Sequence, residues 1–390
     1  MHVVKLLGGI LCIFVVLFDA FQTIILPRRA TGRFRLTRLF YQLTWRPWSF
    51  VARRIKDARA RETSLSFYGP LSLIVLLVVW ASLLVAGFAL LYGGLGTPFQ
   101  DAVKTSGFRS DLYVSGTTIF TLGLGDVVPK TPWARELIVL EAGTGFGFLA
   151  VVMGYFPVLY GAFSRREVSI SLLDTRAGSP PTAAELLRRN AYLGGDAALN
   201  LLLEEWERWS AELLESHISY PLLCYFRSQH NNQSWLSALV AVLDTCALMI
   251  STVKGSSARQ AQLTFAMARH AIADLSQIFS QPPVNDATDR LPPERFQQLH
   301  DMLCESGVRV CRDAESIERL RKMRALYEGY AVAMSRYLFM PLPAWISDGP
   351  HKDNWTVVAR LRAETEAVFA EGAPAQAAPL NIHIEEHHDF

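Results

Sequence analysis

Three long apolar runs in the first 163 residues constrain the fold of this chain more than any other feature. The second run, Leu71 to Tyr92, has no charged residue in 22 positions, and about 20 apolar residues in a helix cross a hydrocarbon core about 30 Å thick. The other two runs, Leu6 to Leu26 and Leu137 to Phe163, contain Asp19 and Glu141. We therefore predict three membrane helices. A carboxylate at membrane depth needs a protein or water partner, so we expect Asp19 and Glu141 each to have one.

The N-terminal run has a second interpretation, because Lys5 precedes an apolar core as in a signal peptide. The core is followed by FQTIILPRRATGRFRLTR rather than by a small-residue cleavage site. We therefore expect a retained N-terminal membrane helix over residues 1–27. We expect its carboxylate, Asp19, to pair with flanking arginines or with Gln22.

The distribution of charge predicts the orientation in the membrane. Residues 28–62 contain eleven Lys or Arg against two acids, Asp57 and Glu62, and such an excess stays on the cytoplasmic side. We therefore predict an integral protein of the plasma or inner membrane, with the N-terminus outside, a basic cytoplasmic linker over residues 28–69, and a cytoplasmic C-terminal domain. Membrane lipid is an expected partner of the basic linker, and nucleic acid is not.

Between the second and third runs lies TTIFTLGLGD, residues 117–126. Ser110 or Asp111 can cap a short helix before it, and that helix is too short to cross the membrane. Irregular backbone at this depth is tolerated only where it is buried in protein or lines a watery cavity. Glycines at alternate positions let successive carbonyl oxygens face one axis and replace the water around a cation. We therefore predict a re-entrant pore loop and, since four copies are needed to surround an ion, a homotetramer.

The stretch TLGLGDVVP resembles the selectivity filter of potassium channels, whose common form is TVGYG. Four following residues stand in the register of small bacterial two-helix channels: Asp126, Pro129, Trp133 and Arg135. Gly145 stands where that family has its inner-helix hinge glycine, and the match runs without gaps from Thr117 to Gly145. The resemblance covers residues 70–163.

This resemblance implies a bacterial potassium channel of the two-helix pore-loop (ion-channel-2) type with an extra N-terminal membrane helix. The pore domain, residues 70–164, would contain an outer helix, a pore helix, the filter and an inner helix. The resemblance implies potassium ions as the permeant ligand and no cofactor. The residues it implies for ion binding are Thr121, Leu122, Gly123, Leu124 and Gly125. The filter would be supported by Asp126, Thr117, Thr118 and Glu141, with Gly145 and Pro157 as gating hinges.

Three positions leave alternatives open. The family usually has a tyrosine where this chain has Leu124, so the hydroxyl that would brace the filter is absent, and a poorly selective cation channel is the alternative. We expect Glu141 to accept a hydrogen bond from Thr117 or Thr118 behind the pore helix, as a structural bond or as a group that makes gating depend on pH. Pro157 either bends the inner helix at a gate or is a passive kink.

The second half of the chain is predicted to be a separate domain. After a linker over residues 165–184, helical periodicity over 182–372 favours a cytoplasmic helical bundle, followed by a flexible tail over 373–390. The expected helices are 182–191, 196–215, 219–229, 234–253, 257–279, 293–306, 313–338 and 352–370. No GxGxxG motif follows a strand, so a dinucleotide-binding domain is not indicated. The histidines of this half lack the spacing of a helix-borne metal site, so no metal is expected.

Together these patterns predict an all-α protein in which a membrane pore-loop channel domain precedes a cytoplasmic helical bundle. The function they favour is a potassium-selective ion channel. Two alternatives remain: a poorly selective cation channel, and a non-conducting membrane sensor or scaffold that acts through the helical domain. An enzyme is not supported, because no nucleophile, base and orienting acid can be assembled from local motifs.

Overall fold

The computed structural model describes residues 2–26, 36–97, 99–101, 107–191, 195–229, 232–253, 258–286 and 288–347. They form two compact units: unit 1 is Met1–Ala162 with Ser219–Arg227, and unit 2 is Phe163–Ile218 with Ser228–Phe390. The predicted helix over 352–370 and the predicted tail over 373–390 lie outside the described residues.

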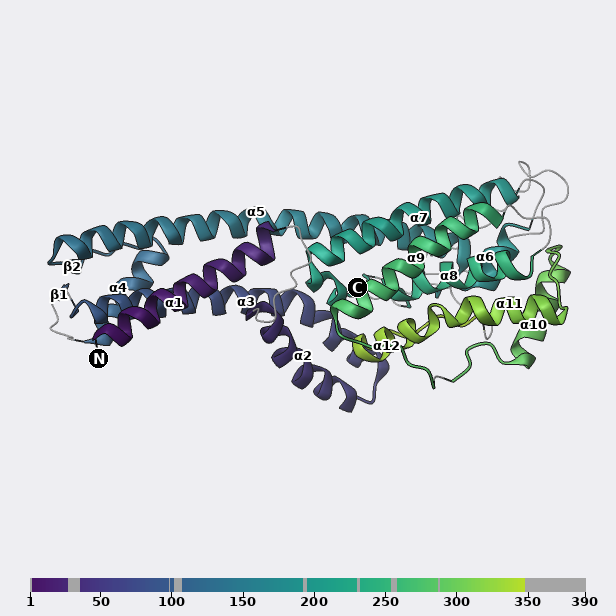
Figure 1. Cartoon of the computed structure of the whole chain (residues 1–390), viewed down its shortest axis with the longest axis horizontal. Helices are drawn as coiled ribbons and strands as arrows, with labels where there is room; N and C mark the ends of the chain where they lie inside the picture. The colour runs from purple at the N-terminus through teal and green to yellow at the C-terminus, as the bar shows by residue number, and fades with distance from the viewer. Residues whose placement is uncertain are drawn as a thin grey trace, which may run out of the picture. The chain divides into compact units, whose positions relative to one another are not determined.

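Unit 1 combines long helices with one small antiparallel sheet (Figure 1). Its elements are α1 (His2–Ala20), the π-helical turn η1 (Phe21–Ile25), α2 (Leu36–Arg54), α3 (Ala58–Gly94), β1 (Phe99–Asp101), α4 (Phe108–Ile119), β2 (Val127–Pro129), the first part of α5 (Pro132–Ala177) and the 3-10 turn η2 (Pro221–Tyr225). Within the described part of the chain, three helical segments are long and apolar enough to cross a membrane: His2–Ile25, Ala58–Gly94 and Pro132–Ala177. The predicted three long apolar helices and the all-helical fold are confirmed.

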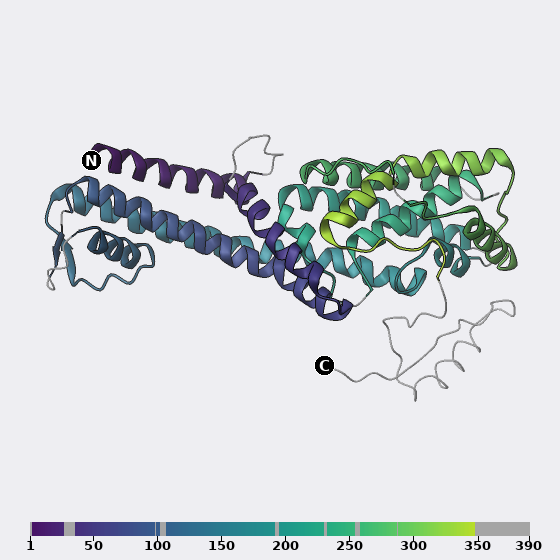
Figure 2. The same cartoon turned by 90° about the horizontal axis from the view of Figure 1, so that it is seen from below.

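Helices α1 and α3 lie side by side (Figures 1 and 2) because small residues allow their backbones to approach. A Cβ atom at Gly9 would lie 2.6 Å from the carbonyl oxygen of Gly87, and one at Gly94 would lie 2.6 Å from Cγ of Leu6. Small residues commonly mediate helix packing in membranes. The N-terminal helix therefore packs on the outer helix of its own chain.

The buried carboxylate of Asp19 connects α1 to two other helices. It accepts hydrogen bonds from the backbone N–H (3.1 Å) and the hydroxyl (2.5 Å) of Thr37 on α2. It also accepts one from the indole N–H of Trp80 on α3 (3.0 Å). These donors, which the sequence analysis did not anticipate, satisfy a buried charge that would otherwise be costly.

The predicted basic linker over residues 28–69 is largely helical where it is described. It contains α2 and the first turns of α3, which begins at Ala58, well before the apolar run. The carboxylate of Asp57 caps this helix by accepting the N–H of Ala60 at 2.7 Å, as expected for an N-cap aspartate.

A segment from later in the sequence, Ser219–Arg227, also belongs to unit 1. The predicted helix over 219–229 is wrong, because only the single 3-10 turn η2 forms there. The ring of Phe226 covers Gly69 of α3, where an added Cβ atom would lie 2.8 Å from it, and Arg227 forms an ion pair of 3.2 Å with Glu62. Contacts with α3 thus replace helix formation in this segment.

Unit 2 is a helical bundle, as predicted. It contains the rest of α5, then α6 (Ala183–Arg189), α7 (Gly195–Ser219), α8 (Trp235–Ser251), α9 (Ala258–Ile278), α10 (Pro293–Glu305), α11 (Ala314–Ala325) and α12 (Glu328–Leu338). All residues of α8 except Ile250 are buried, so α8 is the centre of the bundle. Two expectations were wrong: residues 165–177 of the predicted linker continue α5, and the predicted helix over 313–338 is divided into α11 and α12.

Candidate ion-conduction pore

Helix α4 is the short helix that precedes the filter sequence. It has 12 residues and is therefore about 18 Å long, too short to cross a membrane. Its buried residues include Val114, Ser115 and Ile119, and it packs against α3. The expected cap is wrong: the helix begins after Gly107, which has a φ of +112° and no capping side chain, so Ser110 and Asp111 lie inside it.

The backbone after α4 alternates in handedness. Thr121, Gly123 and Gly125 have φ angles of +57°, +53° and +74°. Of these, threonine rarely adopts a positive φ, whereas glycine does so at little cost. Leu122 and Leu124 are not among the residues with positive φ. Such alternation turns successive carbonyl groups of the segment toward the same side.

The hydrogen bonds of this segment show which side that is. The N–H groups of Leu122 and Gly123 both point to the carbonyl oxygen of Thr117, at 2.7 and 3.3 Å, and the N–H of Thr121 bonds the carbonyl of Thr118 at 3.0 Å. In a trans peptide, the carbonyl of the preceding residue points the opposite way. The carbonyl groups of Thr121 and Leu122 therefore point away from α4. Thr117 and Thr118 support the segment through their backbone oxygens.

The far end of the filter sequence is anchored at two places. The hydroxyl of Tyr113 on α4 donates to the Asp126 carboxylate at 2.8 Å. Directly after Asp126, β2 pairs antiparallel with β1, with Phe99 opposite Pro129. The role of Tyr113 was missed in the sequence analysis, although a tyrosine on the helix before the filter is visible in the sequence.

Glu141 on α5 is fully buried, and its carboxylate connects three helices. Its carboxylate accepts the hydroxyl of Tyr92 on α3 at 2.5 Å and is bonded to the hydroxyl of Ser115 on α4. The expected partners were wrong, since the Thr117 hydroxyl bonds the Val114 carbonyl of its own helix at 3.0 Å. The carboxylate does contact α4, through Ser115.

Gly145 of α5 lies close to the end of α4. A Cβ atom there would lie 2.4 Å from the carbonyl oxygen of Ile119, whereas one at Gly143 or Gly147 would meet no atom of the described chain within 4 Å. This gives Gly145 a packing role, whatever its part in gating. Helix α5 continues through Pro157.

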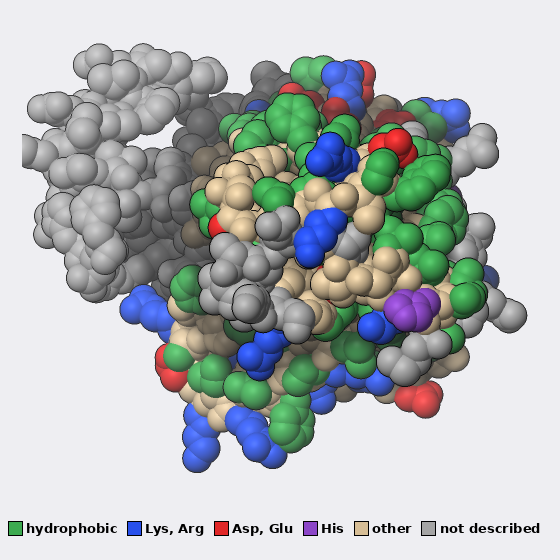
Figure 3. Space-filling view, turned by 90° about the vertical axis from the view of Figure 1, so that its left-hand side faces the viewer, with side chains coloured by type: hydrophobic (Ala, Val, Ile, Leu, Met, Phe, Trp, Pro, Cys, Tyr) green, Lys and Arg blue, Asp and Glu red, His purple; other side chains and the backbone are tan. Residues whose placement is uncertain are grey.

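Much of the segment after α4, and of α5, is exposed in a single chain. Leu122 and Leu124 are 62% and 63% exposed, and apolar residues of α5, including Val139 and Phe146, are about as exposed. Apolar side chains, with Lys and Arg between them, also gather on the face shown in Figure 3. Apolar surface of this extent requires lipid or other protein to cover it.

Residues 74–159 match the family model described as "Ion channel". This chain contains an ion-channel domain. The matched residues include α4, the filter sequence, Glu141 and Gly145, and the family is one of ion channels rather than enzymes.

The chain is also similar to the uncharacterized membrane protein YdjJ of Bacillus subtilis (strain 168). The two are 25% identical over 268 residues, which cover 68% of this chain and 75% of the relative. Because 268 residues exceed the length of the ion-channel domain, the similarity extends beyond the pore. No solved structure was found to match. Together with its three long apolar helices, these findings make the chain an integral membrane protein with an ion-channel domain.

Proposed function

We propose that four copies of this chain form a potassium-selective channel in which the carbonyl oxygens of Thr121–Gly125 line a central axis. The observation that supports this most strongly is the alternation of φ along that segment. Together with the N–H groups turned toward Thr117, it produces a row of carbonyl oxygens of the kind that replaces the hydration shell of a potassium ion. No cofactor is needed for this function.

The exposed apolar residues support the tetramer. The filter residues Leu122 and Leu124 are exposed in one chain although they lie between two membrane helices. A ring of four copies related by a central axis would bring four filters together and cover surface of this kind. The proposal also places the N-terminus outside and unit 2 in the cytoplasm. Gly145 and Pro157 would act as gating hinges.

Potassium flux into liposomes tests this function. At Gly123 and Gly125 a side chain meets no atom within 4 Å, so substitution by alanine acts through the positive φ, which costs an ordinary residue about 1–2 kcal/mol in each chain. We expect Gly123→Ala and Gly125→Ala to reduce flux strongly. Gly8→Ala is the matched control, since its Cβ also meets nothing within 4 Å and α1 is helical there. Equal flux in all variants would contradict the proposal.

A poorly selective cation channel is a second candidate, favoured by one observation. The side chain of Leu124 is 63% exposed in the single chain and has no hydroxyl with which to brace the filter. If the filter is loosely held, sodium flux will approach potassium flux in the same liposomes.

A further inference from the structure

The outward face of α2 combines apolar and basic side chains. Leu39, Leu43 and Phe50 are 52%, 63% and 54% exposed, and at 100° per residue Arg46 and Arg54 fall on the same face. The Arg54 guanidinium lies over the Phe50 ring, 4.2 Å from its centroid. A helix of this kind suits the boundary between lipid headgroups and acyl chains, where arginine keeps its charge in water and its stem on apolar surface.

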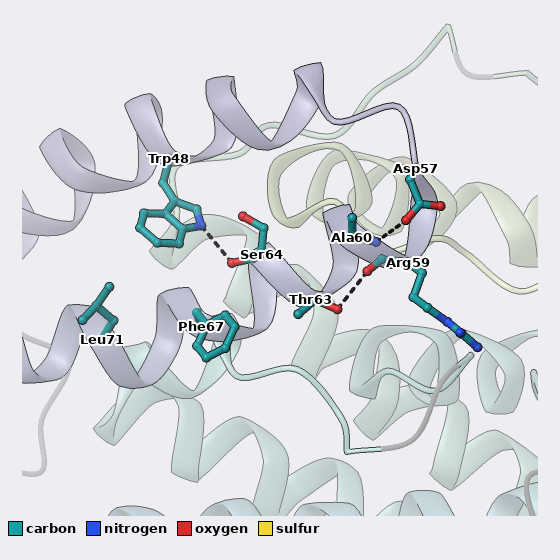
Figure 4. Close-up of a pocket in the computed structure, with 8 residues that line it drawn as sticks. All are labelled: Trp48, Asp57, Arg59, Ala60, Thr63, Ser64, Phe67 and Leu71. Atoms are coloured by element: carbon teal, nitrogen blue, oxygen red, sulfur yellow. Dashed lines mark hydrogen bonds between the residues drawn. The ribbon is translucent and has the colours of Figure 1, made fainter. Parts of the chain in front are cut away.

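A groove of about 690 Å³ lies between α2 and the first turns of α3 (Figure 4). Its walls are fixed to each other, because the indole N–H of Trp48 donates to the Ser64 carbonyl at 3.2 Å. Next to it, the hydroxyls of Thr44 and Tyr68 lie 3.0 Å apart, and the rings of Trp45 and Tyr68 pack at 4.7 Å. The groove is therefore present before any ligand binds, and it is open to the surface along its length.

The groove changes from polar to apolar along α3. Arg59, Thr63, Phe67 and Leu71 line it at intervals of four residues, so they form one stripe on the helix, about 18 Å long. Phe67 and Leu71 are 63% and 43% exposed, and Leu71 begins the uncharged apolar run. The charged end of the stripe thus lies on the side away from the membrane-spanning part of α3.

The charge around the groove favours an anion. Residues 36–62 contain seven Lys or Arg and two acids. Glu62 forms an ion pair with Arg227, whereas Asp57, which caps α3 by accepting the Ala60 N–H, keeps its negative charge and also lines the groove. The basic side chains nearby therefore outnumber the carboxylates that could repel a phosphate.

We propose that this groove binds one anionic phospholipid, with its phosphate at Arg59, its glycerol beside Thr63 and Ser64, and an acyl chain along Phe67 and Leu71. This site does not depend on which ion the pore conducts. It differs from general attraction to the membrane surface because a single groove fixes the headgroup.

Lipid binding to the full-length protein tests the site. Phosphatidylglycerol is titrated into the protein in neutral detergent, and bound lipid is counted by native mass spectrometry, with phosphatidylcholine as the comparison lipid. We expect phosphatidylglycerol to bind more tightly and Arg59→Gln to weaken it about fivefold, the contribution of one basic residue near an anionic surface. Arg61→Gln is the matched control, because it removes the same charge two residues away and Arg61 does not line the groove.

Two further variants change the shape or the apolar wall of the groove and leave its charge unchanged. Thr63→Trp places a large ring in the groove, and Phe67→Ser removes an exposed apolar contact, so neither disturbs a buried core. Both should weaken binding without changing the helical content. Equal losses in Arg59→Gln and Arg61→Gln, or equal binding of the two lipids, would overturn the site. Displacement of the lipid by millimolar inorganic phosphate would show that the groove recognises free phosphate rather than a lipid.

Discussion

At the scale of single residues, the pore region depends on a few buried polar groups whose partners come from other helices. Glu141 is the clearest example, since it connects α3, α4 and α5. A carboxyl group at this position was visible in the sequence, and so was its need for a partner. Its partners Tyr92 and Ser115 were not, because they depend on how three helices rotate against each other.

Replacing Glu141 should loosen the pore helix. Glu141→Ala leaves the buried Tyr92 hydroxyl without an acceptor, whereas Ser115 keeps the Val85 carbonyl at 2.9 Å. An unsatisfied buried hydroxyl costs about 1–3 kcal/mol. We expect a clear fall in the thermal unfolding midpoint of the detergent-solubilised protein and a smaller fall for Glu141→Gln. Glu136→Ala, at an exposed position of the same helix, is the control, and equal midpoints would show that Glu141 has no such role.

His217 makes the stability of unit 2 depend on pH. Its ring is fully buried, its Nδ1 lies 2.8 Å from the Leu213 carbonyl, and its Nε2 lies 3.2 Å from Arg166. Since a carbonyl only accepts, Nδ1 holds the proton and Nε2 accepts from the guanidinium, which is also paired with Glu167 at 2.8 Å. Burial first, and then the Arg166 charge, lower the pKa of His217 well below its usual value.

As the pH falls through about 6.5, His217 therefore binds a proton in the unfolded chain but not in the folded chain. The free energy of unfolding should be unaffected above that pH and should fall below it by about 1.4 kcal/mol per pH unit. Chemical unfolding followed by tryptophan fluorescence between pH 7.5 and 5.5 measures this slope. His217→Gln should reduce the slope, and His270→Gln, at an exposed histidine, should not. An unchanged slope in His217→Gln would refute the assignment.

At the scale of elements, the sequence predicted those helices whose ends are marked by local chemistry. Ser234 caps α8 by accepting the Ser237 N–H at 3.0 Å, and α10 begins at Pro293, as expected. The break between α11 and α12, at Leu326 and Tyr327, contains no glycine or proline, although Gly329 follows it inside α12. It occurs where Tyr327 is buried and its hydroxyl bonds Asp244 of α8. Asp244 also pairs with Arg290 at 2.6 Å. The contact of Tyr327 with α8 therefore accounts for where α11 ends.

The contact between α5 and α4 gives Gly145 a role that can be separated from hinge motion. A Cβ atom at Gly145 would overlap the Ile119 carbonyl at 2.4 Å, and overpacking of this kind costs about 1–3 kcal/mol. We expect Gly145→Ala to lower the unfolding midpoint, and Gly143→Ala, with open space around it, to leave it unchanged. If Gly145 were only a hinge, Gly145→Ala would change channel opening and keep the midpoint of the unsubstituted protein.

At the scale of the whole molecule, the long apolar helices and the positive φ angles at Gly123 and Gly125 could be predicted from the sequence because both depend on short stretches of it. Apolar length predicts a membrane helix, and alternate glycines predict a backbone that supports positive φ. The sequence did not indicate that Ser219–Arg227 packs against α3 in unit 1. In the sequence, this segment has helices of unit 2 on either side. That contact joins segments about 150 residues apart, and no local pattern indicates it.

Selection of potassium by the carbonyl oxygens of Thr121–Gly125 can be measured as a reversal potential. The purified protein is placed in a planar bilayer with potassium chloride on one side and an equal concentration of sodium chloride on the other. Selection of potassium predicts a reversal potential far from zero, of the sign that opposes the flow of potassium out of the potassium chloride side, and a much smaller current in Gly125→Ala. A reversal potential near zero, or an absence of current under every condition, would contradict it.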